Sequence, residues 1–537
     1  MQLRSFNERK SPGNNTAGFL LCLCLLICAS NPARAAGQEG SPDREGVQSV
    51  NSFQFWQQPP CIEPSRDFEV SVEGSNVPVY RARVRAEILT KPGLWSHRPN
   101  APAESASFAI LDLAKPARIS VRPSRPFSSA AVLPKNAGVQ CEVCDGAIVF
   151  EISRPCHLTV ALDGSDKNPL HLLVSTPLPT DELKASRQVI RIGPGAHDTG
   201  GIKLSSGQTL VIEGGAVLRA VMPPEDKGSY SEQWHVTFHG GTVIEIRNAE
   251  NVRVVGRGII TAAGIPHPGW NMIRIEDSRN VTVEGITLLD AANWNVMVNN
   301  SENVNIEDLR IISARLNTDG INSVNSRSVS IRRCFVRNHD DGIVVKTIAS
   351  ARPAADITVR DCTLWADWGY GLGVTYETRS DVRNVIFERC NMIFARHWNL
   401  GIHVSDSGSI SNVVFRDIEI DDLGGTGRTN DARDALGTEP MLFRGVITSD
   451  VWGHDAERGR ISDVAIENIA IKGGRVLPSL LSGFDDSHMI RRVLFRNISL
   501  TDRGFLADAS SLRLTAEKFV DDIRVESGKD TAAEQVR

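Results

Sequence analysis

The chain has 537 residues, of which 41% are hydrophobic and 23% are charged, and its net charge is −5. This composition is typical of a folded globular protein and excludes an intrinsically disordered one. Aromatic residues are sparse at 6% and glycine is plentiful at 44 residues, which favours turn-rich β structure over a helical bundle. The length exceeds that of one ordinary domain and indicates several domains or an extended repeat.

Residues 1–35 have the pattern of a secretory signal peptide. Basic residues precede an apolar run at 18–29, and Ala33-Arg34-Ala35 provides an A-x-A cleavage site. The run is shorter than the ~20 residues that cross a membrane. We therefore expect a secreted or periplasmic protein with no membrane segment after processing. Its net charge then becomes −8, and the absence of a basic block argues against a nucleic-acid partner.

The next part of the chain predicts a small N-terminal domain. Residues 36–60 are polar and are predicted to be a flexible N-terminal segment. Residues 61–180 alternate apolar and polar side chains, as in Phe68–Val72 and Ile148–Ile152. Turn signals about every 8–12 residues separate these runs, which is typical of a β-sandwich.

Four cysteines fall in this early region, namely Cys61, Cys141, Cys144 and Cys156. In an oxidising compartment they are expected to form one or two disulfides or to remain buried thiols. A zinc site at the C-x-x-C pair is the weaker alternative, because no matching second half is present. No metal site is predicted.

A repeated pattern occupies the second part of the chain and predicts a parallel β-helix over residues 181–530. Valine or isoleucine anchors stand at positions 281, 304, 329, 357, 385, 413, 464 and 493, with apolar residues at offsets 0, 2, 5 and 7. Period-two patterning that recurs at this interval indicates a β-solenoid. A leucine-rich repeat would need a Leu-x-Leu pattern and fewer β-branched residues. The long interval from Val413 to Val464 fits two coils or one coil with a long loop.

Three cysteines stand in the offset-5 column of this repeat. Cys334, Cys362 and Cys390 alternate there with isoleucine and leucine in other copies. They are therefore predicted to be stacked core residues of successive coils, and not nucleophiles or metal ligands.

Asp319 is followed 21 and 22 residues later by Asp340 and Asp341. Because neighbouring coils lie ~4.8 Å apart, these acids are expected to meet on one surface. Their like charges would raise at least one pKa, as acid/base catalysis requires. Two carboxyl groups that flank a bond are the minimal machinery for glycoside hydrolysis. Solvated turn acids and a calcium site, as in lyases of this architecture, are the alternatives.

The sequence at these acids resembles glycoside hydrolase family 28, the polygalacturonase family. The resemblance rests on Asn-Thr-Asp-Gly at 317–320 and Asp-Asp-Gly at 340–342, and the coil pattern agrees over roughly residues 185–525. It implies a right-handed, pectin-lyase-like parallel β-helix and an inverting hydrolase without a cofactor. In that scheme Asp341 is the general acid, and Asp319 and Asp340 position and activate the water.

Two further family motifs are altered. Gly-Tyr-Gly at 369–371 replaces Gly-His-Gly, and Gly-Ile-His at 401–403 replaces Arg-Ile-Lys. In polygalacturonases the last motif holds the uronate carboxylate, so its loss removes the reason to expect a uronic acid there. The two-domain layout is similar to glycoside hydrolase family 49, the dextranase and isopullulanase group, which acts on neutral α-glucans. The β-helical α-galactosidases are a third relative.

Polar and aromatic residues near the acids are candidate substrate contacts. They are Asn317, Lys346, Trp294, Asn295, Trp368, Tyr370, Glu377 and His403. Aromatic faces stack on sugar rings, whereas Lys346 is expected to flank the acid pair and tune it. A buried core position is the alternative for each tryptophan, as it is for Trp365.

Together these features predict a secreted, monomeric glycosidase that hydrolyses O-glycosyl bonds of a polysaccharide or oligosaccharide. A polysaccharide lyase is the first alternative and would need a Ca²⁺ cluster and a basic proton abstractor. A non-catalytic carbohydrate-binding solenoid is the second.

Overall fold

The computed structural model describes residues 47–50, 52–85, 104–178, 188–223, 241–266, 269–423 and 439–528. The predicted signal peptide therefore lies outside the described residues. Gly46–Arg537 forms one compact unit. The described part contains a single short 3-10 helix, η1 (Lys135–Ala137), and no helix that is long and apolar enough to span a membrane.

Two largely antiparallel sheets form the first part of this unit. The seven-stranded sheet contains β1 (Val47–Val50), β2 (Phe53–Trp56), β5 (Tyr80–Arg85), β6 (Glu104–Leu113), β8 (Ala130–Leu133), β11 (His157–Leu162) and β12 (Leu170–Ser175). The five-stranded sheet contains β3 (Phe68–Val72), β4 (Ser75–Val77), β7 (Ala117–Pro123), β9 (Cys141–Cys144) and β10 (Ala147–Ile152).

The two sheets pack face to face around one apolar core. In β3, Phe68, Val70 and Val72 are buried and Glu69 is exposed, which is the predicted alternation. These side chains share a cluster with residues of the other sheet such as Leu172. The predicted sandwich is confirmed. Strand β2 pairs with β6, so the sheet begins before residue 61, the predicted start.

The early cysteines are free thiols in this structure, which agrees with the free-thiol alternative and not with the disulfides, although none of the four is fully buried. Cys61 and Cys144 are exposed, and Cys141 and Cys156 are partly buried. Cys141 and Cys144 stand three residues apart on the same extended strand, β9, a separation of about 10 Å that is too long for a disulfide between them.

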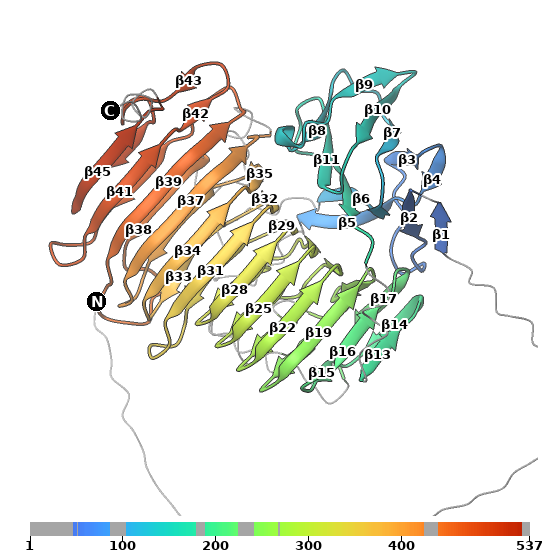
Figure 1. Ribbon diagram of the computed structural model, residues 1–537, viewed down its shortest axis with the longest axis horizontal. Helices are drawn as coiled ribbons and strands as arrows, with labels where there is room; N and C mark the ends of the chain where they lie inside the picture. Colours follow the sequence, from blue (N-terminus) through green and yellow to red (C-terminus); the bar gives the residue numbers. More distant parts are fainter. Residues whose placement is uncertain are drawn as a thin grey trace, which may run out of the picture. The chain divides into compact units, whose positions relative to one another are not determined.

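The second part is a parallel β-helix with three faces (Figure 1). Face 1 contains β13 (Val189–Ile192), β16 (Thr209–Ile212), β19 (Glu250–Gly256), β22 (Arg279–Glu284), β25 (Glu302–Glu307), β28 (Arg327–Arg332), β31 (Ala354–Arg360), β34 (Val382–Glu388), β37 (Ile410–Ile420), β39 (Ile461–Ile471), β41 (Ile490–Arg496) and β45 (Val520–Glu526). Face 2 contains β14 (Gly195–Thr199), β17 (Ala216–Ala220), β20 (Ile259–Thr261), β23 (Thr287–Leu289), β26 (Arg310–Ile312), β29 (Phe335–Asn338), β32 (Thr363–Ala366), β35 (Asn391–Ala395), the last residues of β37 and β39, β42 (Ser499–Leu500) and β43 (Gly504–Phe505).

Face 3 carries the candidate site. Its strands are β15 (Ile202–Leu204), β18 (Thr242–Arg247), β21 (Asn271–Glu276), β24 (Val296–Asn299), β27 (Ile321–Val324), β30 (Ile343–Thr347), β33 (Tyr370–Thr378), β36 (Trp398–Val404), β38 (Met441–Ile447), β40 (Ser479–Ser482) and β44 (Leu514–Ala516). Each complete coil contributes a strand to each face, β45 being the start of a coil that the described residues do not complete, and the apolar side chains of all three faces fill one continuous core.

The predicted anchors pair with one another along face 1. The registers join 281 to 304, 304 to 329, 329 to 357, 357 to 385, 385 to 413, 413 to 464 and 464 to 493. The direct pairing of Val413 with Val464 shows that the long interval is one coil with a long loop. Cys334, Cys362 and Cys390 are fully buried in the core, as predicted.

A left-handed residue stands directly before the anchors and shapes the coil corner. Asn251, Asn280 and Asn303 have φ values of 57°, 55° and 53°. Asparagine adopts this conformation more readily than most residues. The side chains also form a ladder, because Asn280 Nδ2 donates to Asn251 Oδ1 at 3.1 Å and Asn303 Nδ2 donates to Asn280 Oδ1 at 3.4 Å.

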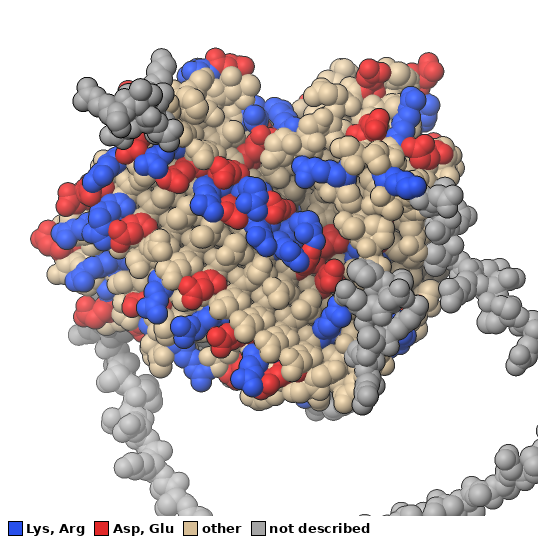
Figure 2. Space-filling model, viewed as in Figure 1, with Lys and Arg blue, Asp and Glu red and all other residues tan. Residues whose placement is uncertain are grey.

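Acidic and basic side chains are interspersed over face 1 (Figure 2). Arg389 pairs with Asp361 at 2.9 Å, and Arg492 pairs with Asp463 at 2.6 Å. Each pair joins neighbouring coils. Exposed pairs of this kind contribute about 0–1 kcal/mol each, so the continuous apolar core is the main source of stability.

Candidate active site

The three predicted acids meet just before consecutive strands of face 3. Asp319 precedes β27, and Asp340 and Asp341 precede β30. The Gly320 amide donates to the Asp341 carbonyl at 2.8 Å, so the two segments are adjacent rungs. A Cβ at Gly320 would lie 2.3 Å from the Gly342 carbonyl oxygen. The glycine that follows each acid, Gly320 or Gly342, therefore lets neighbouring coils approach more closely than a residue with a side chain would allow.

Asp319 is 4% exposed and has a raised pKa. Burial is the main cause, and the neighbouring Asp340 charge raises the pKa further, while Lys346 opposes the shift. Asn322 Nδ2 donates to Asp319 Oδ2 at 3.0 Å. A proton is therefore retained more readily here than on an ordinary aspartate.

Asp341 is 1% exposed, and donors surround its carboxylate. Tyr370 N donates to Oδ1 at 2.9 Å, Thr375 Oγ1 donates to Oδ2 at 2.8 Å, and Lys346 Nζ donates to Oδ2 at 3.2 Å. Both oxygens of this carboxyl group therefore act as hydrogen-bond acceptors, and one of their donors is a charged ammonium.

Asp340 is the least buried of the three acids. Its Oδ2 accepts from the Asn317 amide at 3.2 Å, and its Oδ1 accepts from the Asp341 amide at 3.0 Å. Asn317 is itself in the left-handed region at φ 53°. The Asn-Thr-Asp segment thus helps to orient the first acid of the pair through its backbone.

Lys346 supplies the positive charge of the site and is 3% exposed. Its Nζ lies 3.0 Å from Glu377 Oε2 and 3.9 Å from Asp319 Oδ2, in addition to the contact with Asp341. Burial alone would lower the pKa of Lys346, but Glu377, Asp341 and Asp319 together raise it. The ammonium therefore stays charged and flanks the acids, as predicted from the sequence.

Asn295 lies beneath Asp319 and is fully buried. Its Nδ2 donates to the carbonyls of Thr318 at 3.2 Å and Asp319 at 3.0 Å, and its Oδ1 accepts from Ser313 Oγ at 2.9 Å. Asn295, which the sequence predicted to contact the substrate, therefore holds the backbone of Asp319 in position.

The predicted aromatic residues take different places. Trp294 is 4% exposed and packs with Met297 and Val324 near the Lys346 ammonium, which lies 5.6 Å from its ring. Trp368 is partly exposed and lies edge-on to His397 at 4.2 Å. Trp365, by contrast, is fully buried and stacks on Phe394 at 5.0 Å, so it is a core residue.

Tyr370 and His403 occupy the two altered motifs and lie together. Tyr370 is fully buried, and burial raises its pKa to about 12. Its hydroxyl lies 3.3 Å from His403 Nδ1. Burial, opposed by Asp450 and assisted by Arg444, lowers the pKa of His403, so this imidazole is neutral at neutral pH.

Sequence reasoning missed Thr375, Arg444 and Asp450. Arg444 Nη1 donates to Tyr370 Oη at 2.5 Å, and Asp450 Oδ2 lies 2.8 Å from His403 Nε2. Arg444 and Asp450 follow the irregular insertion after β37, which hides the repeat. Thr375 stands in regular register with His403 on face 3 and could have been found from that alignment.

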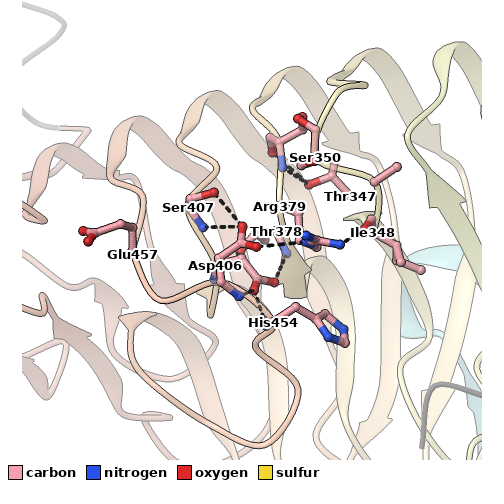
Figure 3. A network of polar contacts seen from close by, with 12 residues as sticks. Thr347, Ile348, Ser350, Thr378, Arg379, Asp406, Ser407, His454 and Glu457 are labelled. Carbon is pink, nitrogen blue, oxygen red and sulfur yellow. Dashed lines mark hydrogen bonds and ion pairs between the residues drawn. The ribbon is translucent and has the colours of Figure 1, made fainter. Parts of the chain in front are cut away.

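A buried carboxylate anchors the loop that carries Asp450 (Figure 3). Asp406 Oδ2 accepts from the Thr378 amide at 3.0 Å, and its Oδ1 accepts from the amides of His454 and of Asp455, the latter at 2.8 Å. Arg379 Nε adds a bond to the Asp455 carboxylate at 3.0 Å. The loop is thereby fixed to the coil corners beside the site.

Among the described residues, no group of three or more His, Cys, Asp or Glu side chains is arranged to hold a metal ion. The space between the acids contains the Lys346 ammonium instead.

Comparison with known proteins gives a consistent result for the central coils. Residues 233–427 match the model of glycosyl hydrolases family 28. A polygalacturonase of Chamaecyparis obtusa is 27% identical over 156 residues, which is 28% of this chain and 29% of that protein. An endo-polygalacturonase of Pectobacterium parmentieri is 21% identical over 42% of this chain and 63% of its own length. The chain thus matches less than a third of the first of these relatives.

Solved structures show the same fold. Dex49A from Penicillium minioluteum covers 89% of this chain and all of its own, with a TM-score of 0.61 at 13% identity. An exopolygalacturonase from Thermotoga maritima covers 65% of this chain and 86% of its own, with a TM-score of 0.51 at 18% identity. The match to Dex49A is too long to be limited to the β-helix, so the likeness of fold extends beyond it. The predicted resemblance to glycoside hydrolase family 28 is confirmed, and its family match spans the coils that carry the three acids.

Proposed function

We propose that this chain is a secreted or periplasmic glycosidase that hydrolyses O-glycosyl bonds of a polysaccharide or oligosaccharide with inversion. The observation that carries the proposal is the meeting of Asp319, Asp340 and Asp341, two of which contact the Lys346 ammonium, within the region that matches the family 28 model. The polygalacturonases among its relatives support a polysaccharide as substrate.

The contacts support a division of roles that differs from the one expected from the sequence. Three donors already point at the oxygens of Asp341 in the resting site, so we assign Asp341 to accept a proton from the water and not to supply one to the leaving group. Asp319 and Asp340 repel each other and are expected to share a proton as a pair. Asp340 is the more exposed of the two, so it is the better donor to a glycosidic oxygen.

The proposed step is a single displacement. Asp340 transfers its proton to the glycosidic oxygen as the bond from that oxygen to the anomeric carbon breaks. A water molecule attacks the anomeric carbon from the opposite face and loses its proton to Asp341, with Asp319 as its second acceptor. The two carboxyl groups need ~6.5–9.5 Å between them for this water. Lys346 balances the charge of the acids throughout.

The test measures reducing ends released from a panel of neutral and uronic polysaccharides. Asp340→Asn and Asp341→Asn are expected to lower kcat by at least 10³-fold with little change in KM, because both act on the reacting atoms. The matched control is Asp486→Asn, which alters an exposed carboxylate. NMR of the first product should show the inverted anomer.

Two outcomes would contradict the proposal. Products that absorb in the ultraviolet through a new double bond would identify a lyase instead. Release of no sugar from any member of the panel, with unchanged glycan binding in both variants, would favour a non-catalytic binding solenoid.

A further inference from the structure

Arg444 is a partly buried cation without a carboxylate partner. Its contacts are neutral groups, namely Tyr370 Oη at 2.5 Å, His403 Nδ1 at 3.1 Å and the Trp398 ring centroid at 4.9 Å. Among the described residues, no carboxylate oxygen lies within 4.0 Å of its guanidinium nitrogens. Among the arginines that the structure describes as partly or fully buried, most do pair with acids, such as Arg475 with Asp422. A desolvated guanidinium without an anion is costly, so the missing partner requires an explanation.

The hydrogen bonds also fix what surrounds the guanidinium. Arginine can only donate, so His403 Nδ1 accepts, and the proton of the neutral imidazole stands on Nε2. Nε2 lies 2.8 Å from Asp450 Oδ2, which is thereby engaged with His403 and with Ser405 Oγ at 2.8 Å. Burial would lower the pKa of Arg444, but the Tyr370 hydroxyl and the charge of Asp450 raise it, although Asp450 makes its direct contact with His403. Only Nη1 of the guanidinium is used, which leaves Nε and Nη2 for a ligand.

The position of Arg444 follows from the register of face 3. It pairs with Gly401, the first residue of the altered motif. A Cβ at Gly401 would lie 2.3 Å from Tyr370 Cε1, so the glycine makes room for the tyrosine ring. Arg444 belongs to β38, and its guanidinium extends across β36 to the hydroxyl of Tyr370 on β33. The Tyr370 amide in turn binds Asp341 at 2.9 Å, which places the cation near the acids.

We infer that Arg444 is a specificity-determining residue that binds an acidic sugar unit, through a carboxylate or a sulfate ester, next to the proposed cleavage site. This inference rests on the proposed function. The guanidinium fork suits two parallel bonds to two oxygens of either anion, and the Trp398 ring, 4.9 Å from the guanidinium carbon, packs against the fork. The inference supplies a new reason to expect an acidic glycan, after the altered motif at residues 401–403 had removed the one that the family resemblance offered.

The first experiment measures kcat/KM of the full chain on polygalacturonic acid and on the same polymer after chemical reduction of its carboxyl groups, with a sulfated galactan as a third arm. We expect the acidic-to-neutral ratio to fall at least tenfold in Arg444→Gln and by less in Arg444→Lys, which keeps the charge but loses the fork. Arg383→Gln, an exposed arginine on β34, is the matched control and should keep the parent ratio.

Preference for one acidic arm identifies the anion as carboxylate or sulfate. A parent enzyme that cleaves the reduced polymer at least as well as both acidic polymers would overturn the inference, as would an unchanged ratio in Arg444→Gln.

A binding experiment separates this inference from the proposed hydrolysis. Calorimetry with trigalacturonic acid, its carboxyl-reduced counterpart and a sulfated galactan oligosaccharide requires no turnover. Acidic ligands should bind the parent at least tenfold more tightly than the neutral one, and this preference should weaken with salt and be lost in Arg444→Gln. Such a result without hydrolysis would refute the proposed function alone. Equal binding of the acidic and neutral ligands to the parent, which needs no variant to fold, would refute the inference.

Discussion

The ammonium of Lys346 lies 3.2 Å from the carboxylate of Asp341, at a place where both side chains are almost wholly removed from water. The same ammonium contacts Glu377 at 3.0 Å. Asp319, Asp341 and Glu377 all lie within 4.0 Å of this ammonium. Without its charge, burial and mutual repulsion would drive protons onto these acids. The lysine therefore sets the ionisation of the site as well as its shape.

Replacing Lys346 with methionine should destabilise the protein by about 3–5 kcal/mol at pH 7, since it leaves buried carboxylates without their counter-ion. The pKa of Lys346 is raised in the folded state, so its contribution is complete below the unfolded value and is lost only as pH rises through the folded one. Urea unfolding measures the loss. Lys203→Met, at a lysine whose side chain is 86% exposed, should change stability by less than about 1 kcal/mol. An equal effect of the two substitutions would contradict the counter-ion role.

Asp319→Asn should abolish most activity yet stabilise the protein at pH 7. The folded-state pKa of Asp319 is raised, so the folded protein binds the proton more tightly than the unfolded chain. This acid therefore costs stability as pH rises above its unfolded value of 3.8, and the asparagine removes that cost.

Chemical denaturation from pH 4 to pH 8 tests this expectation. The stability gain of Asp319→Asn should be largest at pH 8 and vanish near pH 4. Asp486→Asn should show no comparable trend. A gain that does not change with pH would show that the asparagine acts through packing.

Asn295→Ala should lower kcat more than it changes KM. The substitution removes the donor to the Thr318 and Asp319 carbonyls, which lie 23 and 24 residues away in sequence, and the backbone of the acid loses its support. Leaving these buried carbonyls unsatisfied costs about 1–3 kcal/mol of stability. Steady-state kinetics and thermal unfolding measure both effects. The control is Asn305→Ala, at an exposed position of β25, and an increase in KM alone would indicate direct substrate contact instead.

The β-helix could be predicted because the apolar residues that fill its core recur in the sequence once per coil. The anchors Val281 and Val304 pair in the structure as their spacing requires, and Cys362 lies in the core where its column placed it. The acids could be predicted for the same reason, because residues about one coil length apart in sequence lie side by side on adjacent coils.

Contacts that depend on irregular segments could not be predicted. Arg444 and Asp450 enter the site after an insertion whose length obeys no period, and only the three-dimensional register connects Arg444 with Gly401. Local patterning likewise does not tell which acid is held by three donors, because Tyr370 and Thr375 reach Asp341 from the next coil.

The asparagine ladder at the coil corners has a consequence for the tolerance of the chain to change. Each rung bonds only to the rungs beside it, as Asn280 does to Asn251 and Asn303, so a defect at one corner disturbs its neighbours and leaves distant coils intact. Coils far from β27 and β30 can therefore be gained, lost or decorated with loops during evolution. The three acids depend on two adjacent coils, whereas the proposed anion site at Arg444 stands on β38, three coils beyond β30, so the glycan preference can change while the coils of the acids stay the same.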